Sequence, residues 1–383
     1  MKLLYLHELP LNSGQANMIQ VLQMCHAFQN LGMDVELGVP DGGVSRSEIP
    51  GLIENELGEP VRFSVVNYPQ LSWRGRARTL GSYPGVRSLL QGNGHVDYCY
   101  VRSPLLVKMA VHQRLKTIFE SHGDRLHPTL GFLNRWYTGL LLEAARSPYL
   151  INFIAISEAL AAVWRDRGVP PEKMLVLHDG VSAGHYASGK TREEARLELG
   201  LRPEEKIVVY AGSLYEDREI DSLFKLAAAF GDSSFVVVGG PGSRKGLYES
   251  RARSHGLENL TFVGRVPHRQ VKEYLFAADV LLMLWSWQVP TIRICSPLKV
   301  FEYMAAGRII VGYGFPTIRE VLTDGETAWL ASPGSYADLE KKLAHGLSCT
   351  YPSLMGEKAR ALALGEYTWE RRARRILEQI SGN

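Results

Sequence analysis

The strongest constraint on the fold is a regular alternation of short apolar runs with longer stretches of helical spacing. The runs occupy residues 2–6, 35–39, 97–101, 116–121, 152–157 and 174–178, then 206–212, 234–240, 260–264, 279–284 and 308–313. The runs of the second series are rich in β-branched residues. After the first run, apolar residues recur at helical spacing: Met18, Leu22, Cys25 and Phe28. Runs that are apolar on both faces predict strands of parallel sheets covered by helices.

A polar stretch at residues 182–205 separates the two series of runs. The chain has 383 residues, which is enough for two domains of roughly 150–200 residues each. We therefore predict two successive doubly wound α/β domains, residues 1–185 and 186–365. Ligands of such domains bind beyond the carboxyl ends of the strands, so we expect a site there, in a cleft between the domains.

Composition and charge exclude several classes of protein. A net charge of +3 is too small to indicate a nucleic-acid partner. The four cysteines form no CxxC pair, which argues against a zinc site or a disulfide scaffold and suits a reducing cytoplasm. No apolar run approaches the roughly 18 residues that span a bilayer. His7 and Glu8 interrupt the N-terminal apolar run, which therefore predicts a strand and not a signal peptide.

The stretch "SPLKVFEYMAAG", residues 296–307, predicts a helix with a defined start and stop. Ser296 is a good N-cap, Pro297 suits the first helical position, and Gly307 suits the residue after the end. Lys299 and Glu302 then share one helical face near the helix N-terminus. They form either a plain surface ion pair or part of a ligand site.

As a ligand site, this helix start has a particular chemistry. Unpaired N–H groups and Lys299 would attract an anion. Glu302, one turn deeper, would repel an anion but could hold hydroxyl groups. A nucleotide, which carries phosphates at one end and a ribose diol further on, fits both requirements.

Other candidate residues follow the predicted strands of the second domain. They are Gly212, Ser213 and Arg218 after the first strand, Gly239 and Gly240 after the second, and Arg265 after the third. The glycines would allow close approach of a ligand to the backbone, and Arg218 could converge with Lys299 on a phosphate. The alternative for Arg218 is a surface ion pair with a neighbouring acidic residue.

The first domain offers two weaker candidates. Gly14 lies in a loop that leads into a helix, where it could approach a phosphate or sugar or serve only as a helix entry. His122 follows a predicted strand, where a single histidine can equally be structural.

With these residues in place, the chain resembles the retaining GT-B glycosyltransferases of family 4, also called glycosyl transferases group 1. "SPLKVFEYMAAG" resembles their donor-binding helix. The resemblance covers almost the whole chain and includes "LNSGQANMIQVLQMCHAFQNLGMDVEL", "AISEAL", "LHDGV", "YAGSLYEDREIDSL", "ADVLLML" and "YTWERRARRILEQI". It implies two Rossmann-like domains facing across a cleft: an acceptor domain over residues 1–185 and a nucleotide-sugar domain over residues 186–365. A terminal helix over residues 366–383 would pack back on the first domain.

The resemblance also implies roles for individual residues. Glu302 matches the glutamate that binds the ribose hydroxyls, and Arg218 matches a diphosphate-binding lysine. Lys299 and the backbone N–H groups near Leu298, in the segment that begins with Ser296 and Pro297, match the diphosphate and donor-sugar site. Gly14 matches the N-terminal loop near the diphosphate, and His122 matches a histidine beside the reacting carbon of the donor sugar.

Three positions depart from the family pattern. The first glutamate of the Glu-x7-Glu motif is Ile294, an arginine that often follows the first strand of the second domain is Ser213, and a glycine is Glu219. Ile294 and Glu219 keep open the alternative of a weakly active or inactive GT-B protein that binds a nucleotide-sugar or supports a partner enzyme. A nucleotide-sugar epimerase on the same fold is a second alternative.

The implied function is transfer of a sugar, with retention, from a UDP-, GDP- or ADP-linked donor to a hydroxyl of a sugar, glycolipid or other acceptor. The donor is a substrate, so no cofactor is expected. The sequence has no Asp-x-Asp, the metal-carrying motif of the other large glycosyltransferase fold, so no metal is expected.

Two arginine-rich stretches raise a further hypothesis about partners. One contains Trp73, Arg74, Arg76, Arg78, Tyr83 and Arg87, and the other, in the terminal helix, contains Arg371, Arg372, Arg374 and Arg375. They are either solvated surfaces or a patch for an acceptor or an anionic membrane, as in a cytoplasmic protein that is peripheral on the inner membrane face.

Overall fold

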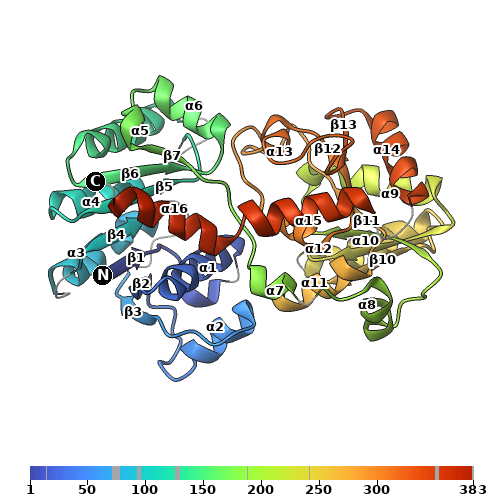
Figure 1. Ribbon diagram of the computed structural model, residues 1–383, viewed down its shortest axis with the longest axis horizontal. Coiled ribbons are helices and arrows are strands. Elements are labelled where there is room, and N and C mark those ends of the chain that lie inside the picture. Colours follow the sequence, from blue (N-terminus) through green and yellow to red (C-terminus); the bar gives the residue numbers. More distant parts are fainter. Residues whose placement is uncertain are drawn as a thin grey trace. The chain divides into compact units, whose positions relative to one another are not determined.

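The computed structural model describes residues 1–13, 15–70, 78–92, 96–125, 130–187, 189–240, 242–349 and 353–381. The chain divides into two compact units, each built around its own sheet (Figure 1). Unit 1 contains residues 1–179, 294–296 and 369–383, and unit 2 contains residues 180–293 and 297–368. The assignment of an acceptor role to one unit and a donor role to the other stays a prediction.

Unit 1 contains a seven-stranded sheet in the order β3-β2-β1-β4-β5-β6-β7. Every neighbouring pair of strands is parallel. The strands are β1 (Lys2–Leu6), β2 (Asp34–Pro40), β3 (Ser64–Tyr68), β4 (Tyr98–Val101), β5 (Thr117–Ser121), β6 (Leu150–Ala155) and β7 (Met174–Val176). The helices are α1 (Ala16–Asn30), α2 (Ile49–Leu57), α3 (Arg78–Gly92), α4 (Pro104–His112), α5 (Gly131–Arg146), α6 (Glu158–Asp166) and α16 (Trp369–Ser381), with 3-10 turns at η1 (Leu11–Ser13) and η3 (Pro171–Lys173).

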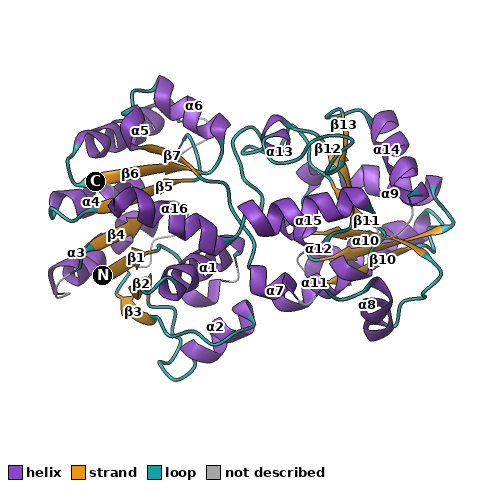
Figure 2. Cartoon of the chain, in the orientation of Figure 1, coloured by secondary structure: helices purple, strands orange, loops and turns teal. Residues whose placement is uncertain are grey.

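Unit 2 contains a six-stranded parallel sheet in the order β10-β9-β8-β11-β12-β13. The strands are β8 (Lys206–Ala211), β9 (Ser233–Val238), β10 (Leu260–Gly264), β11 (Val280–Met283), β12 (Ile309–Tyr313) and β13 (Trp329–Ala331). The helices are α7 (Ala183–Ala187), α8 (Arg192–Leu199), α9 (Ile220–Ala229), α10 (Gly242–Ser254), α11 (His268–Ala277), α12 (Leu298–Ala306), α13 (Pro316–Arg319), α14 (Tyr336–Ser348) and α15 (Leu354–Glu366), with a 3-10 turn at η4 (Glu216–Arg218). Figure 2 shows the strands of each sheet in orange, with helices in purple around them.

The predicted fold class is confirmed, because both sheets are parallel and both are built from alternating strands and helices. The central strands are buried along almost their whole length, as the apolar runs indicated; β4 and β12, for example, are buried at every residue. The runs did not predict β3 and β13. Both are edge strands, and Tyr68 is the one buried residue of β3.

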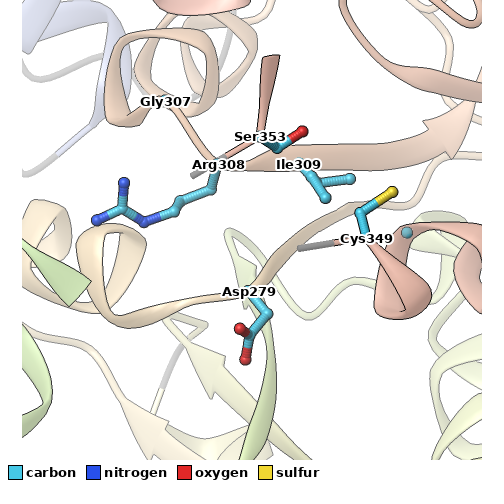
Figure 3. A pocket seen from close by; sticks show the side chains of 7 residues that line it. Asp279, Gly307, Arg308, Ile309, Cys349 and Ser353 are labelled. Atoms are coloured by element: carbon cyan, nitrogen blue, oxygen red, sulfur yellow. The ribbon is translucent and has the colours of Figure 1, made fainter. Parts of the chain in front are cut away.

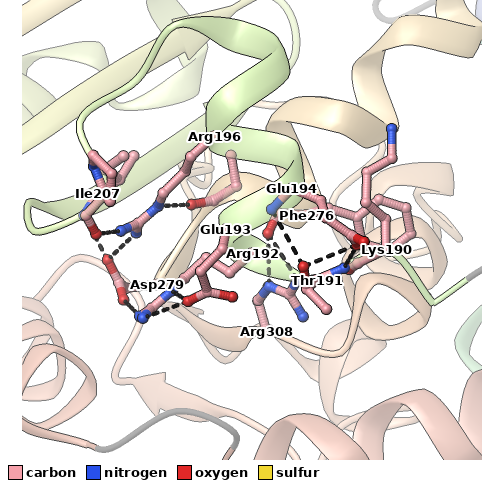
Figure 4. Close-up of polar contacts among 12 residues, drawn as sticks. Lys190, Thr191, Arg192, Glu193, Glu194, Arg196, Ile207, Phe276, Asp279 and Arg308 are labelled. Atoms are coloured by element: carbon pink, nitrogen blue, oxygen red, sulfur yellow. Dashed lines mark hydrogen bonds and ion pairs between the residues drawn. The ribbon is translucent and has the colours of Figure 1, made fainter.

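The amino end of the unit 2 sheet carries a buried ionic cluster of Asp279, Arg192 and Arg196 (Figure 4). Asp279, directly before β11, accepts hydrogen bonds from Nη2 of Arg196 at 2.7 Å and from Nη1 of Arg192 at 2.5 Å. It also accepts from the backbone N–H of Ile207 at 2.7 Å. Asp279 and Arg196 are 8% and 1% exposed, so this buried charge is paired on each side.

Arg308, at the same end of the sheet, is satisfied by backbone carbonyl groups. Its guanidinium donates to Phe276 O at 2.7 and 2.9 Å, to Ala306 O at 3.1 Å and to Lys190 O at 3.4 Å. A small pocket opens beside it, lined by Asp279, Gly307, Arg308, Ile309, Gly346, Cys349 and Ser353 (Figure 3). Because these arginines already have partners, we interpret this end of the sheet as structural.

Unit 1 also has a buried ionic cluster, and its cation comes from the terminal helix. Nη1 of Arg372, in α16, lies 2.8 Å from Oε2 of Glu120, which is completely buried at the end of β5. Arg372 also donates to the carbonyl groups of His178 at 2.9 Å and Leu177 at 3.3 Å. These bonds attach α16 to unit 1, where it also packs on α1.

This pairing corrects part of the membrane-patch hypothesis. Arg372 is 4% exposed and bound to Glu120, so it cannot attract headgroups. Arg371, Arg374 and Arg375 are exposed, as are Tyr83 and Arg87 on α3. Trp73, Arg74 and Arg76 lie outside the described residues, as does the side chain of Arg78. Within the described ranges, no helix is both long enough and apolar enough to cross a membrane.

Candidate active site

The carboxyl end of the unit 2 sheet brings Lys299 against the end of β8. Tyr303, one turn further along α12, accepts a hydrogen bond at its hydroxyl from the backbone N–H of Ala211 at 2.7 Å. Residues four apart share one face of a helix, so this bond also directs Lys299 to the same place. A Cβ atom on Gly212 would lie 2.5 Å from Nζ of Lys299. A side chain at this position would therefore displace the ammonium group.

Backbone conformation and packing explain the presence of glycine at positions 239 and 240, after β9. Both have positive φ angles, +113° and +78°. A Cβ on Gly239 would lie 2.4 Å from the carbonyl oxygen of Gly212, and a Cβ on Gly240 would lie 2.7 Å from the side chain of Leu214. The two glycines allow the turns after β8 and β9 to touch, which brings the predicted glycine residues together. Whether they also approach a ligand stays a prediction.

Two aromatic rings hold the ammonium group of Lys299. Its Nζ lies 4.5 Å from the ring centre of Tyr210 and 4.9 Å from that of Trp285, a residue just beyond β11. Both rings are buried. Desolvation, together with the nearby charge of Arg218, lowers the pKa of Lys299 to about 7 despite the opposing effect of Glu302. Cation–π contact stabilises a cation without neutralising it, so an anion would be a favourable additional partner.

Arg218 contributes a second cation to this end of the sheet. It ends the η4 turn, and its charge lowers the pKa of Lys299. Its Nε lies 3.6 Å from Oδ1 of Asp217, and both atoms are buried without a hydrogen-bond partner among the described residues. This distance is too long for a hydrogen bond. Of the ion pairs that the sequence left open as an alternative, the one with Asp217 is thus a loose contact, and the side chain of Glu216 lies outside the described part of the chain.

Glu302 lies one turn beyond Lys299, and its carboxylate has a partner that the sequence analysis missed. Nε2 of His268 lies 2.6 Å from Oε1 of Glu302. Burial raises the pKa of Glu302, but His268, His185 and Lys299 lower it by more, so the carboxylate stays ionised at neutral pH. The two residues are 34 positions apart, and no local pattern links them.

Glu219, which replaces a glycine of the family pattern, adopts a backbone conformation that normally favours glycine. Its φ and ψ are +54° and +36°, in the left-handed region. Its Oε2 accepts a hydrogen bond from the hydroxyl of Ser222 at 3.1 Å, in the first turn of α9. The Glu219 carboxylate is therefore already hydrogen-bonded to the helix that follows it.

Ser213 and Arg265 complete the predicted residues of unit 2 at the strand ends. The carbonyl oxygen of Ser213 accepts a hydrogen bond from the hydroxyl of Tyr210 at 2.8 Å, which ties the turn to the ring beneath Lys299. Arg265 follows β10 and is exposed. β10 is an edge strand of the sheet and lies two strands from β8.

The start of the predicted helix differs from the expectation. α12 begins at Leu298, with Pro297 as its N-cap, and ends before Gly307, whose φ is +68°. The stop was thus predicted correctly, but Ser296 does not cap the helix. Its hydroxyl instead accepts a hydrogen bond from the backbone N–H of Asp179 at 2.9 Å, within unit 1.

Ile294 also belongs to unit 1. Its side chain is 8% exposed and packs in the hydrophobic core of that unit. Its carbonyl oxygen accepts a hydrogen bond from the hydroxyl of Ser157 at 2.8 Å. An apolar side chain here is thus explained by packing, where the family pattern has a glutamate.

His122 lies just beyond β5 in unit 1 and bonds through Nε2 to Oε1 of the buried Glu120. Burial and the charge of Arg102 lower the pKa of His122 to about 4, although Glu120 raises it. The ring is therefore neutral at pH 7, and Glu120 fixes its direction. Sequence reasoning missed Glu120, although it stands two residues before His122. Gly14 lies outside the described residues.

Across the residues that the structure describes, no group of three or more His, Cys, Asp or Glu side chains is arranged to hold a metal ion.

Two protein-family models match consecutive parts of the sequence. The model described as "Glycosyl transferases group 1" matches residues 191–362, and the model described as "Glycosyl transferase 4-like domain" matches residues 19–180. The chain belongs to the glycosyl transferases group 1 family. It has the GT-B fold of that family, as the sequence resemblance predicted.

Known members of the family show similarity over much of the chain. The lipopolysaccharide 1,2-N-acetylglucosaminetransferase of Salmonella typhimurium is 26% identical over 243 residues, which is 60% of this chain. The D-inositol 3-phosphate glycosyltransferase of Streptomyces avermitilis is 25% identical over 303 residues, which is 74% of this chain. In both comparisons the matched region spans 61% of the relative's length.

Solved structures of the fold align over the full chain. Anabaena HepE in complex with UDP and glucose has a TM-score of 0.73 at 17% identity, with 100% of both chains covered. Sucrose-phosphate synthase of Thermosynechococcus elongatus has a TM-score of 0.77 at 15% identity, covering 100% of this chain and 98% of that one. At these identities the likeness establishes the fold alone.

Proposed function

We propose that the protein is a retaining glycosyltransferase that moves a sugar from a nucleoside diphosphate donor to an acceptor hydroxyl. The observation that carries this proposal is the state of Lys299 and Arg218. These two half-buried cations lie near each other at the carboxyl end of a parallel sheet, beside the start of α12, and neither is hydrogen-bonded to a carboxylate among the side chains that the structure describes. Two mutually repelling cations favour a ligand with more than one negative charge, such as a diphosphate.

The position of Glu302 supports a nucleotide as that ligand. It lies one turn deeper in α12, it is ionised, and its Oε2 has no hydrogen-bond partner within the described residues. A carboxylate oxygen in this state accepts hydrogen bonds from a ribose diol. Phosphates at Lys299 and hydroxyls at Glu302 would thus bind opposite parts of one nucleotide.

In the proposed reaction, the bond between the anomeric carbon and the diphosphate oxygen breaks, and a bond to the acceptor oxygen forms on the same face of the sugar. The acceptor proton passes to an oxygen of the leaving diphosphate, so the products are a glycoside and a nucleoside diphosphate. Negative charge grows on the diphosphate as the bond breaks, and Lys299 and Arg218 would stabilise it. His122, neutral and held by Glu120, would contribute a hydrogen bond near the donor sugar.

A panel of UDP-, GDP- and ADP-linked sugars tests the proposal. We begin with UDP-glucose, because a protein of similar fold, HepE, has been solved in complex with UDP and with UDP-glucose. A true donor should stabilise the protein against heat by RT ln(1 + [L]/Kd) and should stand apart from the others. No stabilisation by any member of the panel would contradict the proposal.

Incubation of the bound donor without an acceptor separates the remaining functions. Slow hydrolysis supports a transferase, an epimerised sugar supports an epimerase, and binding without turnover supports a protein that only holds a nucleotide-sugar. Ile294, which packs in the core in place of a glutamate, is the observation that favours the last of these. The acceptor, whether polysaccharide, glycolipid or small glycoside, is then sought with the donor so identified.

Metal independence is part of the same proposal. Two cations and a helix N-terminus would supply the positive charge that a divalent metal supplies elsewhere. Titration of nucleoside diphosphate with and without EDTA tests it, and a large loss of affinity in EDTA would show that a metal takes part.

A further inference from the structure

His268 occupies a fixed position at the start of α11, directly after Pro267. Its Nε2 lies 2.6 Å from Oε1 of Glu302, and the two side chains are 21% and 15% exposed. α11 and α12 pack against each other. The contact is therefore made between two neighbouring helices and does not depend on a surface loop.

The contact engages only one oxygen of the carboxylate. Oε1 of Glu302 faces His268, and Oε2 has no protein partner in the described part of the chain. Because one oxygen of the carboxylate is held by His268, the orientation of the whole group is fixed. Its second oxygen, Oε2, then points in a different direction from Oε1. The bond thus leaves Glu302 both ionised and oriented.

Other groups around the pair are cationic or aromatic. The ring of His185, from α7, lies 6.4 Å from that of His268, and Lys272 donates to the carbonyl oxygen of His185 at 3.1 Å. Lys299 lies one turn away on α12. The carboxylate that contacts His268 in this group is that of Glu302.

We propose that His268 is a positioning residue for nucleotide binding: it donates its Nε2–H to Oε1 of Glu302 and thereby turns Oε2 toward the hydroxyl groups of the ribose. The inference rests on the proposed function. A side chain that acts only through Glu302 affects the recognition of the diol and not the binding of the diphosphate. His268 is then a determinant of the preference for ribonucleotides over nucleotides without these hydroxyls.

The test measures the affinity of UDP, GDP and ADP, and of their 2′,3′-dideoxy counterparts, by calorimetry. We expect His268→Ala to weaken the best-binding ribonucleotide by about 5- to 30-fold, because an unoriented carboxylate makes poorer hydrogen bonds. The dideoxy counterpart should change by less than about twofold, since it offers no hydroxyl to Glu302. His268→Gln keeps an N–H donor and should restore ribonucleotide affinity to within about threefold of wild type.

His255→Ala is the matched control. This histidine also belongs to unit 2, is exposed after α10, and contacts Arg251 and Ser254. It should leave both affinities unchanged. Thermal unfolding of each variant shows whether the protein is intact.

Each outcome separates this inference from the proposed function. If wild-type protein binds none of the three diphosphates, the proposed function fails and this inference fails with it. If wild type binds and His268→Ala binds equally well, or weakens ribonucleotide and dideoxynucleotide alike, only the positioning role is overturned. Equal losses in the Ala and Gln variants would overturn the donated hydrogen bond.

Discussion

The two ends of the unit 2 sheet use the same kinds of charged side chain in opposite ways. At the amino end, Asp279 pairs with Arg192 and Arg196 at hydrogen-bonding distance. At the carboxyl end, Lys299 lies against two aromatic rings, and the contact of Arg218 with Asp217 is 3.6 Å long. A cation whose partner is built into the fold serves stability, whereas a cation without such a partner is available to a ligand. The charged side chains at the amino end of this sheet therefore serve stability, whereas those at the carboxyl end serve the proposed function.

The largest expected effect is a loss of stability when the ion pairs at the amino end of the sheet are broken. Asp279→Ala would remove the carboxylate that pairs with the buried Arg196, leave Arg192 with Glu193, and remove the acceptor of the Ile207 N–H. We expect a loss of about 3–5 kcal/mol in the free energy of unfolding, the usual cost of a broken buried pair. Chemical denaturation measures it.

Asp217→Ala, at the other end, is the matched control for Asp279→Ala. Because its contact with Arg218 is loose and partly exposed, we expect a loss of at most about 1 kcal/mol. Similar losses in the two variants would mean that the two ends do not differ as proposed.

The second prediction tests the carboxyl end through turnover. Lys299→Ala should lower the transfer rate at saturating donor by about 100- to 1000-fold and weaken donor binding by less, because the charge that Lys299 meets grows in the transition state. Its stability should not fall, since the change removes a desolvated cation near Arg218. Wild-type turnover in this variant would mean that the start of α12 has only a structural role.

The third prediction concerns Glu302, whose charge is opposite to that of its neighbours. Glu302→Gln should weaken nucleotide binding by about 1–2 kcal/mol, or roughly 5- to 30-fold, because charge-assisted hydrogen bonds become neutral ones. Glu273→Gln is the control, since Glu273 lies on α11 and pairs with Lys190 at 2.6 Å. Unchanged nucleotide affinity in Glu302→Gln would exclude a ribose contact.

The smallest effect is a pH dependence. Desolvation holds the pKa of Lys299 at about 7, so the ammonium group loses its proton as the pH rises through neutrality. An anion binds the protonated form better, and binding raises the pKa. Nucleotide affinity should therefore be highest below pH 7 and fall above it, by at most about tenfold per pH unit.

Calorimetry in buffers of different ionisation enthalpy should detect proton uptake when wild-type protein binds nucleotide at pH 8. In Lys299→Ala, the uptake that we assign to Lys299 should be absent. The same slope of affinity against pH in both proteins would assign the dependence to another group.

The sequence predicted the central strands well, because strands buried on both faces are apolar at every position. It did not predict β3 and β13, since an edge strand has fewer neighbours and needs no continuous apolar run. The ends of α12 illustrate the same limit. Gly307 ends the helix because glycine readily adopts a positive φ, which is a local property. Ser296 does not cap the helix because its hydroxyl bonds to Asp179, 117 residues distant in the sequence.

Candidate site residues divide in the same way. Lys299, Glu302 and Arg218 could be chosen from the sequence because helix starts and strand ends are local patterns. Their partners could not, because His268 and Trp285 meet them only after the sheet has formed. Glu120 is an exception: it stands near His122 in the sequence but lies inside β5, where a strand pattern gives no reason to suspect a buried carboxylate.

The pairing of Glu120 with Arg372 has a consequence for the order in which the protein is made. The two residues are 252 positions apart, and nearly all of unit 2 is synthesised between them. Domains usually fold as they emerge from the ribosome, N-terminal domain first. Unit 1 cannot finish in that way, because α16, with the Arg372 that pairs with Glu120, leaves the ribosome only after unit 2 has done so. The first domain to appear is thus the last to be completed.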